Sequence, residues 1–180
     1  HRFLQDIGHE LKRALLDGSF LFRGQRQPVS ELDANLKAAA DKMMGQVGER
    51  IYEKYGDAPG QANTNLAETL LRAGLAGVTT QIDPLSLIVV EDGQPRLKEE
   101  HPAIVAIKDF IDSRGNVDGD AISKHFSGPP YGWSKDTIRY VLAAMLLGSL
   151  LKVNHQSKSS TVVGDITLGA FRNNQSFRQA

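Results

Sequence analysis

The chain has 180 residues, of which 41% are hydrophobic and 23% charged, and its 21 Lys and Arg balance its 21 Asp and Glu. This composition is typical of a globular protein with one sizeable core or two small ones, and it argues against disorder throughout. Because the chain has no cysteine, disulfides and thiolate metal sites are excluded, and we expect a reducing, cytoplasmic setting.

No stretch approaches the roughly 18 consecutive apolar residues of a membrane-spanning helix, and no basic segment precedes an apolar one as in a signal peptide. We therefore expect no membrane partner. The chain starts at His1, without an initiator methionine and within a helical pattern, so we expect it to be a fragment of a longer protein.

Charge is distributed unevenly along the chain. Residues 1–100 carry 12 Lys and Arg against 15 Asp and Glu, and residues 101–180 carry 9 against 6, so the net charges are −3 and +3. A mild basic bias of the second half permits contact with nucleic acid, but it is weaker than the bias of a dedicated nucleic-acid-binding protein.

The first half of the chain reads as helices with short strands. Apolar residues at helical spacing predict a helix over residues 2–16, and the aromatic run at 19–23 predicts a strand followed by a turn or loop at 24–28. Ser30 then caps a predicted long helix that runs to about residue 55.

A stretch rich in Gly, Pro and Asn at residues 56–63 predicts an exposed linker, and a short helix follows over residues 65–71. The β-branched run at 85–90, the Asp92-Gly93 turn and residues 95–97 predict a hairpin. We place a domain boundary here, so that residues 1–98 form a helical lobe with short strands and residues 99–180 form a second domain.

The second half has the element order of a winged-helix domain: three helices, a strand, a polar loop and a returning strand. The predicted segments are helices at 102–114, 118–126 and 134–147, a strand at 150–153, a polar tip at 155–160, a returning strand at 161–163 and a tail at 165–180 that suits either helix or strand. The fold class that we expect is mainly α with small β elements, α+β, with a helical lobe before the winged helix.

The best-defined element is the third helix of this domain. Ser134 can cap it, Asp136 places negative charge in its first turn, and Gly148 can end it. Its apolar residues recur at the spacing of one buried face, and the face left over carries Lys135 and Arg139.

Motifs of catalysis are missing from the sequence. There is no Gly-Lys dipeptide and hence no phosphate-binding P-loop, no Gly-x-Ser-x-Gly elbow and no His-Glu-x-x-His, and the five histidines are scattered. Asp112, Asn116, Asp118 and Asp120 lack the spacing of a calcium loop, and a turn with a helix cap explains them. We therefore expect no enzymatic activity, metal or cofactor in this fragment.

Two sets of residues are candidates for binding. Lys135, Arg139, Lys152 and Lys158, on the third helix and the wing, are candidate phosphate contacts, unless they form an ordinary solvated face. The helix offers no Asn or Gln for adenine edges, so any contact with DNA is expected to be non-specific. Tyr131 and Trp133 either contact a partner or bases, or pack over the helical core.

Four segments together resemble a known family. They are residues 22–25 (FRGQ), 50–55 (RIYEKY), 128–147 (GPPYGWSKDTIRYVLAAMLL) and 173–177 (NNQSF). They are similar to the large P-loop ATPase of BREX (bacteriophage exclusion) phage-defence systems, downstream of its ATPase core, and residues 128–147 are the most specific match. The resemblance implies a parent ATPase that uses ATP and magnesium outside this fragment. It also implies other BREX components, including a DNA methyltransferase, as partners.

The resulting hypothesis is a non-catalytic assembly module of a BREX ATPase whose winged helix contacts proteins and duplex DNA. A second copy of the chain, through self-association, is a further candidate partner. The alternative hypothesis is a DNA-binding domain of a transcriptional regulator.

Overall fold

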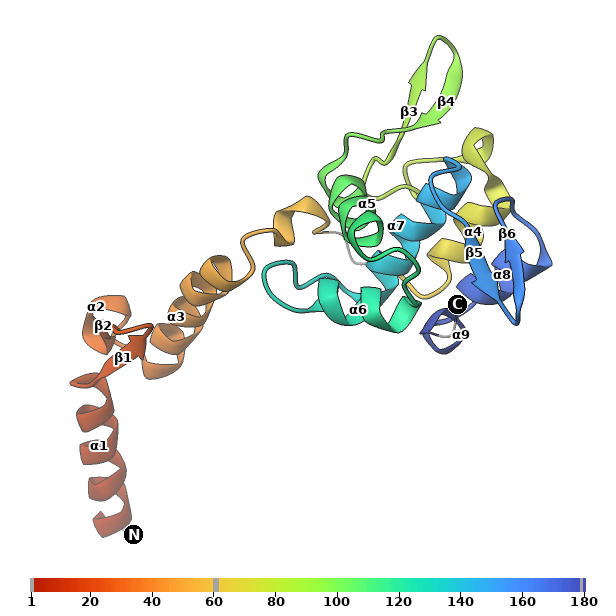
Figure 1. Ribbon diagram of the computed structural model, residues 1–180. Helices are drawn as coiled ribbons and strands as arrows, with labels where there is room; N and C mark the ends of the chain where they lie inside the picture. The colour runs from red at the N-terminus through yellow and green to blue at the C-terminus, as the bar shows by residue number, and fades with distance from the viewer. Residues whose placement is uncertain (1, 60–61, 179) are drawn as a thin grey trace. The chain divides into compact units, whose positions relative to one another are not determined.

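The computed structural model describes residues 2–59, 62–178 and 180, and it has an α+β fold (Figure 1). Among these residues, helices are accompanied by three two-stranded antiparallel sheets, each a local hairpin. The chain divides into two compact units, His1–Tyr52 and Glu53–Ala180. Each unit is described by itself below.

The first unit is two helical segments joined through a hairpin. Its elements are α1 (Arg2–Leu16), β1 (Ser19–Phe22), β2 (Gln25–Pro28), α2 (Val29–Leu32) and α3 (Leu36–Ile51). Strand β1 pairs with β2 from Ser19 opposite Pro28 to Phe22 opposite Gln25, so the expected loop at 24–28 is mostly a strand. Among the described residues of this unit, Val29 and Ala39 are the buried hydrophobic ones, so its core is very small.

The helix expected from Ser30 to about residue 55 is interrupted. Asp33 has an extended backbone and its carboxylate accepts a hydrogen bond from the Asn35 amide, at 2.9 Å. Asn35 in turn caps α3, because its side chain accepts from the amides of Lys37 and Ala38. Short polar side chains of this kind compete with the helical backbone for hydrogen bonds, which ends α2 and starts α3.

The second unit holds the remaining elements. They are the 3-10 helix η1 (Tyr55–Asp57), α4 (Leu66–Ala73), the 3-10 helix η2 (Leu75–Gly77), β3 (Ile88–Glu91), β4 (Gln94–Leu97), α5 (Pro102–Arg114), α6 (Gly119–Ser127), α7 (Lys135–Leu147), β5 (Val153–His155), β6 (Lys158–Ser160), α8 (Asp165–Phe171) and α9 (Asn174–Arg178). The predicted caps Asp118 and Ser134 are confirmed, since Asp118 accepts from the Ala121 amide and Ser134 from the Thr137 amide.

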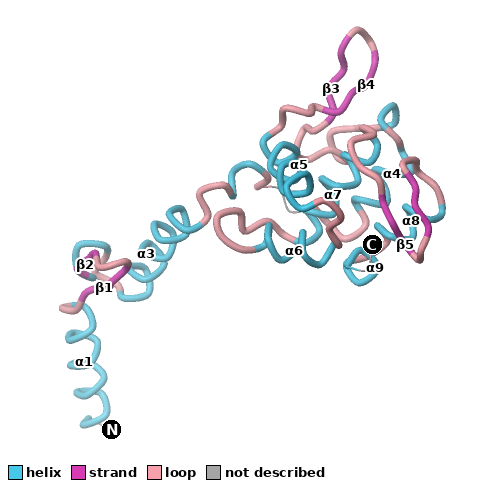
Figure 2. The backbone as a smooth tube through the Cα atoms, in the orientation of Figure 1, coloured by secondary structure: helices cyan, strands magenta, loops and turns pink. Residues whose placement is uncertain are grey.

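Helix α7 lies at the centre of this unit, with α4, α5, α6 and α9 packed around it (Figure 2). Every residue from Thr137 to Leu146 is buried, so the helix has no exposed face beyond its first turn. Residues of α4, of the segment before β3 and of α5, such as Leu70, Leu87 and Ile104, share its core. The boundary expected between residues 98 and 99 therefore falls inside this unit, because segments on both sides of it bury one continuous core.

The segment that was expected to form the wing differs from the expectation. Strand β5 starts only at Val153, and it pairs with Lys158–Ser160 rather than with residues 161–163. The tail forms helices α8 and α9. Across the described ranges, no helix is both long and apolar enough to span a membrane.

Candidate functional site

The loop before α7 is part of the core. Trp133 is 1% exposed and Tyr131 is 8% exposed. The Trp133 ring stacks on Phe126 with 5.1 Å between centroids, and its Nε1 donates to the Lys54 carbonyl over 3.1 Å. Buried indole N–H groups generally find such an acceptor. Of the two interpretations of Tyr131 and Trp133, packing over the helical core is thus the one that the structure supports, and their assignment as partner-binding residues is corrected, because these rings attach residue 54 to the core.

Arg139 is also buried, so it cannot serve as a phosphate contact in this structure. Its side chain is 0% exposed, and its Nη2 donates to the Thr64 carbonyl and, over 3.0 Å, to the Asp136 carboxylate. Its Nε and Nη1 have no hydrogen-bond partner among the described residues. Burial lowers the pKa of Arg139, and the neighbouring Asp136 opposes that shift. The prediction failed because spacing alone could not show that the loop at residues 62–65 covers this face of the helix.

The other three candidate phosphate contacts are exposed. Lys135 lies in the first turn of α7, Lys152 precedes β5, and Lys158 begins β6. None of the three forms an ion pair with another described residue. These three cations remain available to contact phosphate. Helix α7 contributes only Lys135 to this set, from its first turn.

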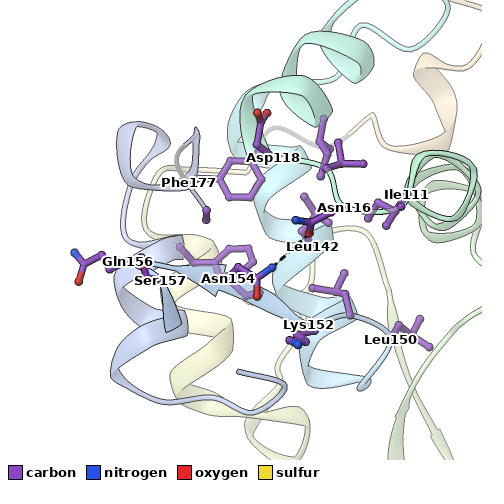
Figure 3. A pocket seen from close by; sticks show the side chains of 18 residues that line it. Ile111, Asn116, Asp118, Leu142, Leu150, Lys152, Asn154, Gln156, Ser157 and Phe177 are labelled. Atoms are coloured by element: carbon purple, nitrogen blue, oxygen red, sulfur yellow. Dashed lines mark hydrogen bonds between the residues drawn. The ribbon is translucent and has the colours of Figure 1, made fainter. Parts of the chain in front are cut away.

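A partly open pocket of about 530 Å³ lies in the second unit (Figure 3). It lies between the turn that joins α5 to α6 and the segment that leads through β5 into its hairpin turn. The larger apolar side chains that line it come from five helices, from β5 and from the segments that precede α6 and β5: Ile111, Val117, Ile122, Leu142, Leu150, Leu151, Val153, Phe171 and Phe177. Pockets of this size and composition commonly hold small molecules or side chains of partners.

Polar groups of the pocket come from both of these segments. Asn154 Nδ2 donates to Asn116 Oδ1 over 3.4 Å, as the dashed line in Figure 3 shows. Asn154 Oδ1 accepts from the hydroxyl of Ser159 at 2.6 Å. Lys152 also lines the pocket, and Asp118 Oδ1 is committed to the Ala121 amide at 2.7 Å.

Helix α9 forms another wall of the pocket, and it sits directly on the start of α6. The Gly119 amide donates to the Ala180 carbonyl over 3.2 Å, and a Cβ at Gly119 would lie 2.1 Å from the Phe177 carbonyl oxygen. Only glycine allows this approach. Asn116, Asp118 and Lys152 stand out in the sequence, but the pocket could not be predicted from it, since its residues carry no motif and meet only through the tertiary fold.

A second exposed feature is the apolar face of α1. Phe3, Leu4, Ile7, Leu11 and Leu15 recur at helical spacing, and each is 46–75% exposed. Single exposed apolar residues are common, whereas a continuous stripe of this kind is typical of an interaction surface.

The polar groups of the core have structural roles. Asp83 accepts from the Leu87 and Ile88 amides and from the Tyr140 hydroxyl, and burial together with Asp83 raises the pKa of Tyr140. Within the described part of the chain, no group of three or more His, Cys, Asp or Glu could hold a metal ion.

Comparisons with protein-family models, with curated proteins and with solved structures give no match to this chain.

Proposed function

We propose that the chain is a non-catalytic assembly module of a BREX-type phage-defence ATPase, which docks on another protein of the complex through α1. The main support for this proposal is the exposed apolar stripe of α1. Among the described residues, the core of the unit that contains α1 consists of Val29 and Ala39 alone. Burying a leucine-sized side chain stabilises by roughly 1.5–3 kcal/mol, so covering this stripe would contribute substantially to association. The resemblance of residues 128–147 supplies the defence context.

The same proposal assigns a winged-helix-like arrangement to residues 99–180, with non-specific contact to duplex DNA. The order of α5, α6, α7, β5 and β6 supports it, and Lys135, Lys152 and Lys158 are the cations concerned. ATP and magnesium belong to the parent protein outside this fragment, and a DNA methyltransferase is among the proposed partners.

The alternative, a sequence-specific domain of a transcriptional regulator, has less support. A recognition helix has to present side chains to base edges in the major groove. In α7 the ten residues from Thr137 to Leu146 are buried. Only side chains of its first turn could therefore contact base edges.

The assembly role is tested by co-purification of the tagged 180-residue chain with the co-expressed components of a BREX system. We expect a component to be retained, and we expect the double substitution Leu4→Glu and Leu11→Glu to reduce its recovery at least about tenfold, the equivalent of 1.4 kcal/mol. The matched control, Gln5→Glu with His9→Glu, adds the same charge on the polar side of α1 and should have no effect.

Retention that is unchanged by the Leu4 and Leu11 substitutions would contradict docking through α1. Failure of every component to co-purify would contradict the assembly role. For DNA, binding to duplex that weakens with salt and with Lys152→Glu is expected; binding that is strong and sequence-selective would favour the regulator.

A further inference from the structure

We propose that the pocket beside β5 binds a short acidic peptide segment of another protein, which inserts one apolar side chain between α7 and α9. This inference concerns a surface other than α1 and names the chemistry of its occupant. It does not depend on the defence context of the proposed function.

The apolar part of the pocket accounts for the inserted side chain. Leu142 of α7, Leu150 and Val153 near β5, and Phe171 and Phe177 of the last two helices line it. A volume of about 530 Å³ exceeds what one leucine or phenylalanine side chain needs, so part of the adjoining peptide would enter as well.

The two asparagines account for recognition of the peptide backbone. The bond between Asn154 and Asn116, at 3.4 Å, is long and therefore weak. In this bond Asn116 accepts through its Oδ1, and among the described residues its amino group donates no hydrogen bond; an asparagine amide offers both donors and an acceptor. A peptide group likewise offers one N–H and one C=O, so it could replace the weak bond by bonds to both side chains.

The charges around the pocket favour an acidic peptide. Lys152 lines it and Lys158 follows on the same hairpin, and both are exposed without an ion pair among the described residues. On the opposite side, Asp118 accepts from its own helix, and Asp120 is paired with Lys124 at 2.7 Å and Arg178 at 2.6 Å. Asp118 keeps its negative charge, because a hydrogen bond from an amide does not neutralise a carboxylate. The unpaired charges named here are therefore two cations, Lys152 and Lys158, and one anion, a net positive charge that favours an acidic partner.

A nucleic-acid base fits the same pocket less well. Stacking of a base needs the exposed face of an aromatic ring, but Phe171 and Phe177 are only 1% and 4% exposed. The other large apolar residues of the walls are aliphatic, and Lys152 is the one cation among the described residues that line the pocket.

The test is a selection of random short peptides displayed on phage against the immobilised 180-residue chain. In parallel, the selection is run on Asn154→Trp, whose indole should fill the pocket from an exposed rim position. We expect enriched sequences that combine one large apolar residue with neighbouring Asp or Glu. Labelled synthetic copies of these should bind with at least about tenfold lower affinity to Asn154→Trp and to Lys152→Glu in fluorescence anisotropy.

Asn65→Trp is the matched control, since Asn65 is exposed in the same unit, does not line the pocket and makes no side-chain capping bond. Circular dichroism verifies that each variant is folded. Absence of enriched peptides, or enriched peptides that bind Asn154→Trp equally well, overturns the proposal. A labelled single-stranded oligonucleotide that loses binding specifically in Asn154→Trp would replace the peptide by a nucleic acid. Each of these results is independent of whether BREX components co-purify through α1.

Discussion

At the scale of single residues, Gly119 controls how α9 attaches to the rest of the second unit. Its missing side chain allows the Phe177 carbonyl to approach the first turn of α6, and the Gly119 amide bonds to Ala180. The same contact positions Phe177 as a wall of the pocket.

Gly119→Ala should therefore displace α9 and lower the free energy of unfolding by about 1–3 kcal/mol, as other overpacking substitutions do. Gly56→Ala is the control, because no atom lies within 4 Å of a Cβ there. It should change stability by less than about 0.5 kcal/mol in urea denaturation. Equal effects of the two substitutions would contradict the close packing of α9 on α6.

Arg139 is a second residue whose role is decided by burial. Arg139→Ala removes its bonds to Thr64 and Asp136 and leaves a cavity, so we expect a loss of about 2–4 kcal/mol in urea denaturation. Arg139→Met should cost less, because it keeps the volume and removes guanidinium nitrogens that lack partners. Lys135→Ala, on the exposed first turn, should be nearly neutral. A harmless Arg139→Ala would show that this side chain is not buried in solution.

Among the elements, the start of α5 makes the stability of the folded protein depend on pH. His101 Nδ1 accepts from the Ala103 amide at 3.3 Å, which requires a neutral ring nitrogen. Burial, and secondarily Lys98, lower the pKa of His101, and burial also lowers that of His125. The folded protein consequently binds fewer protons than the unfolded chain, so its stability rises with pH.

We expect this stabilisation to be complete above the ordinary histidine pKa of about 6.5 and to be lost as the pH falls from there through the lowered pKa of the folded state. His101→Asn should keep the cap and reduce the dependence, with His125 responsible for the remainder. Thermal unfolding of both proteins across this range is the measurement. A variant that is as pH-sensitive as the original would exclude His101 as a cause.

The hairpins show what local sequence can decide at this scale. Asp92 and Gly93 have φ of 52° and 74° and connect β3 to β4 as their dipeptide predicts. The β1–β2 turn is of the same kind, at Arg23 and Gly24 with φ of 47° and 79°, but Arg23 is an uncommon residue there and β2 was predicted to be a loop.

At the scale of the whole molecule, the main core belongs to one of the two units. Its buried members all lie between Ala58 and Phe177. A fragment of residues 53–180 should therefore unfold cooperatively by itself, with the near-ultraviolet circular dichroism of Trp133 preserved. A fragment of residues 1–52 should show no cooperative transition, because a core of two small side chains cannot offset its chain entropy. Cooperative unfolding of the shorter fragment would contradict this division.

Features that depend only on neighbouring residues could be predicted from the sequence. Ser134 and Asp118 cap the helices that they were predicted to cap, because a side-chain oxygen reaches an amide three residues ahead whatever the rest of the chain does. The three helices α5, α6 and α7 were likewise predicted from local spacing, whereas the returning strand was expected at residues 161–163 and the tail was left as either helix or strand.

Which faces of these elements are exposed depends instead on how the chain packs in three dimensions. Helix α7 has one obvious apolar face in the sequence, yet the loop before α4 also covers Arg139, which was predicted to be on a solvent face. The pocket likewise depends on Asn116 and Asn154 meeting across 38 positions of sequence. Such contacts are set by how distant segments pack, which residue spacing along one helix does not encode.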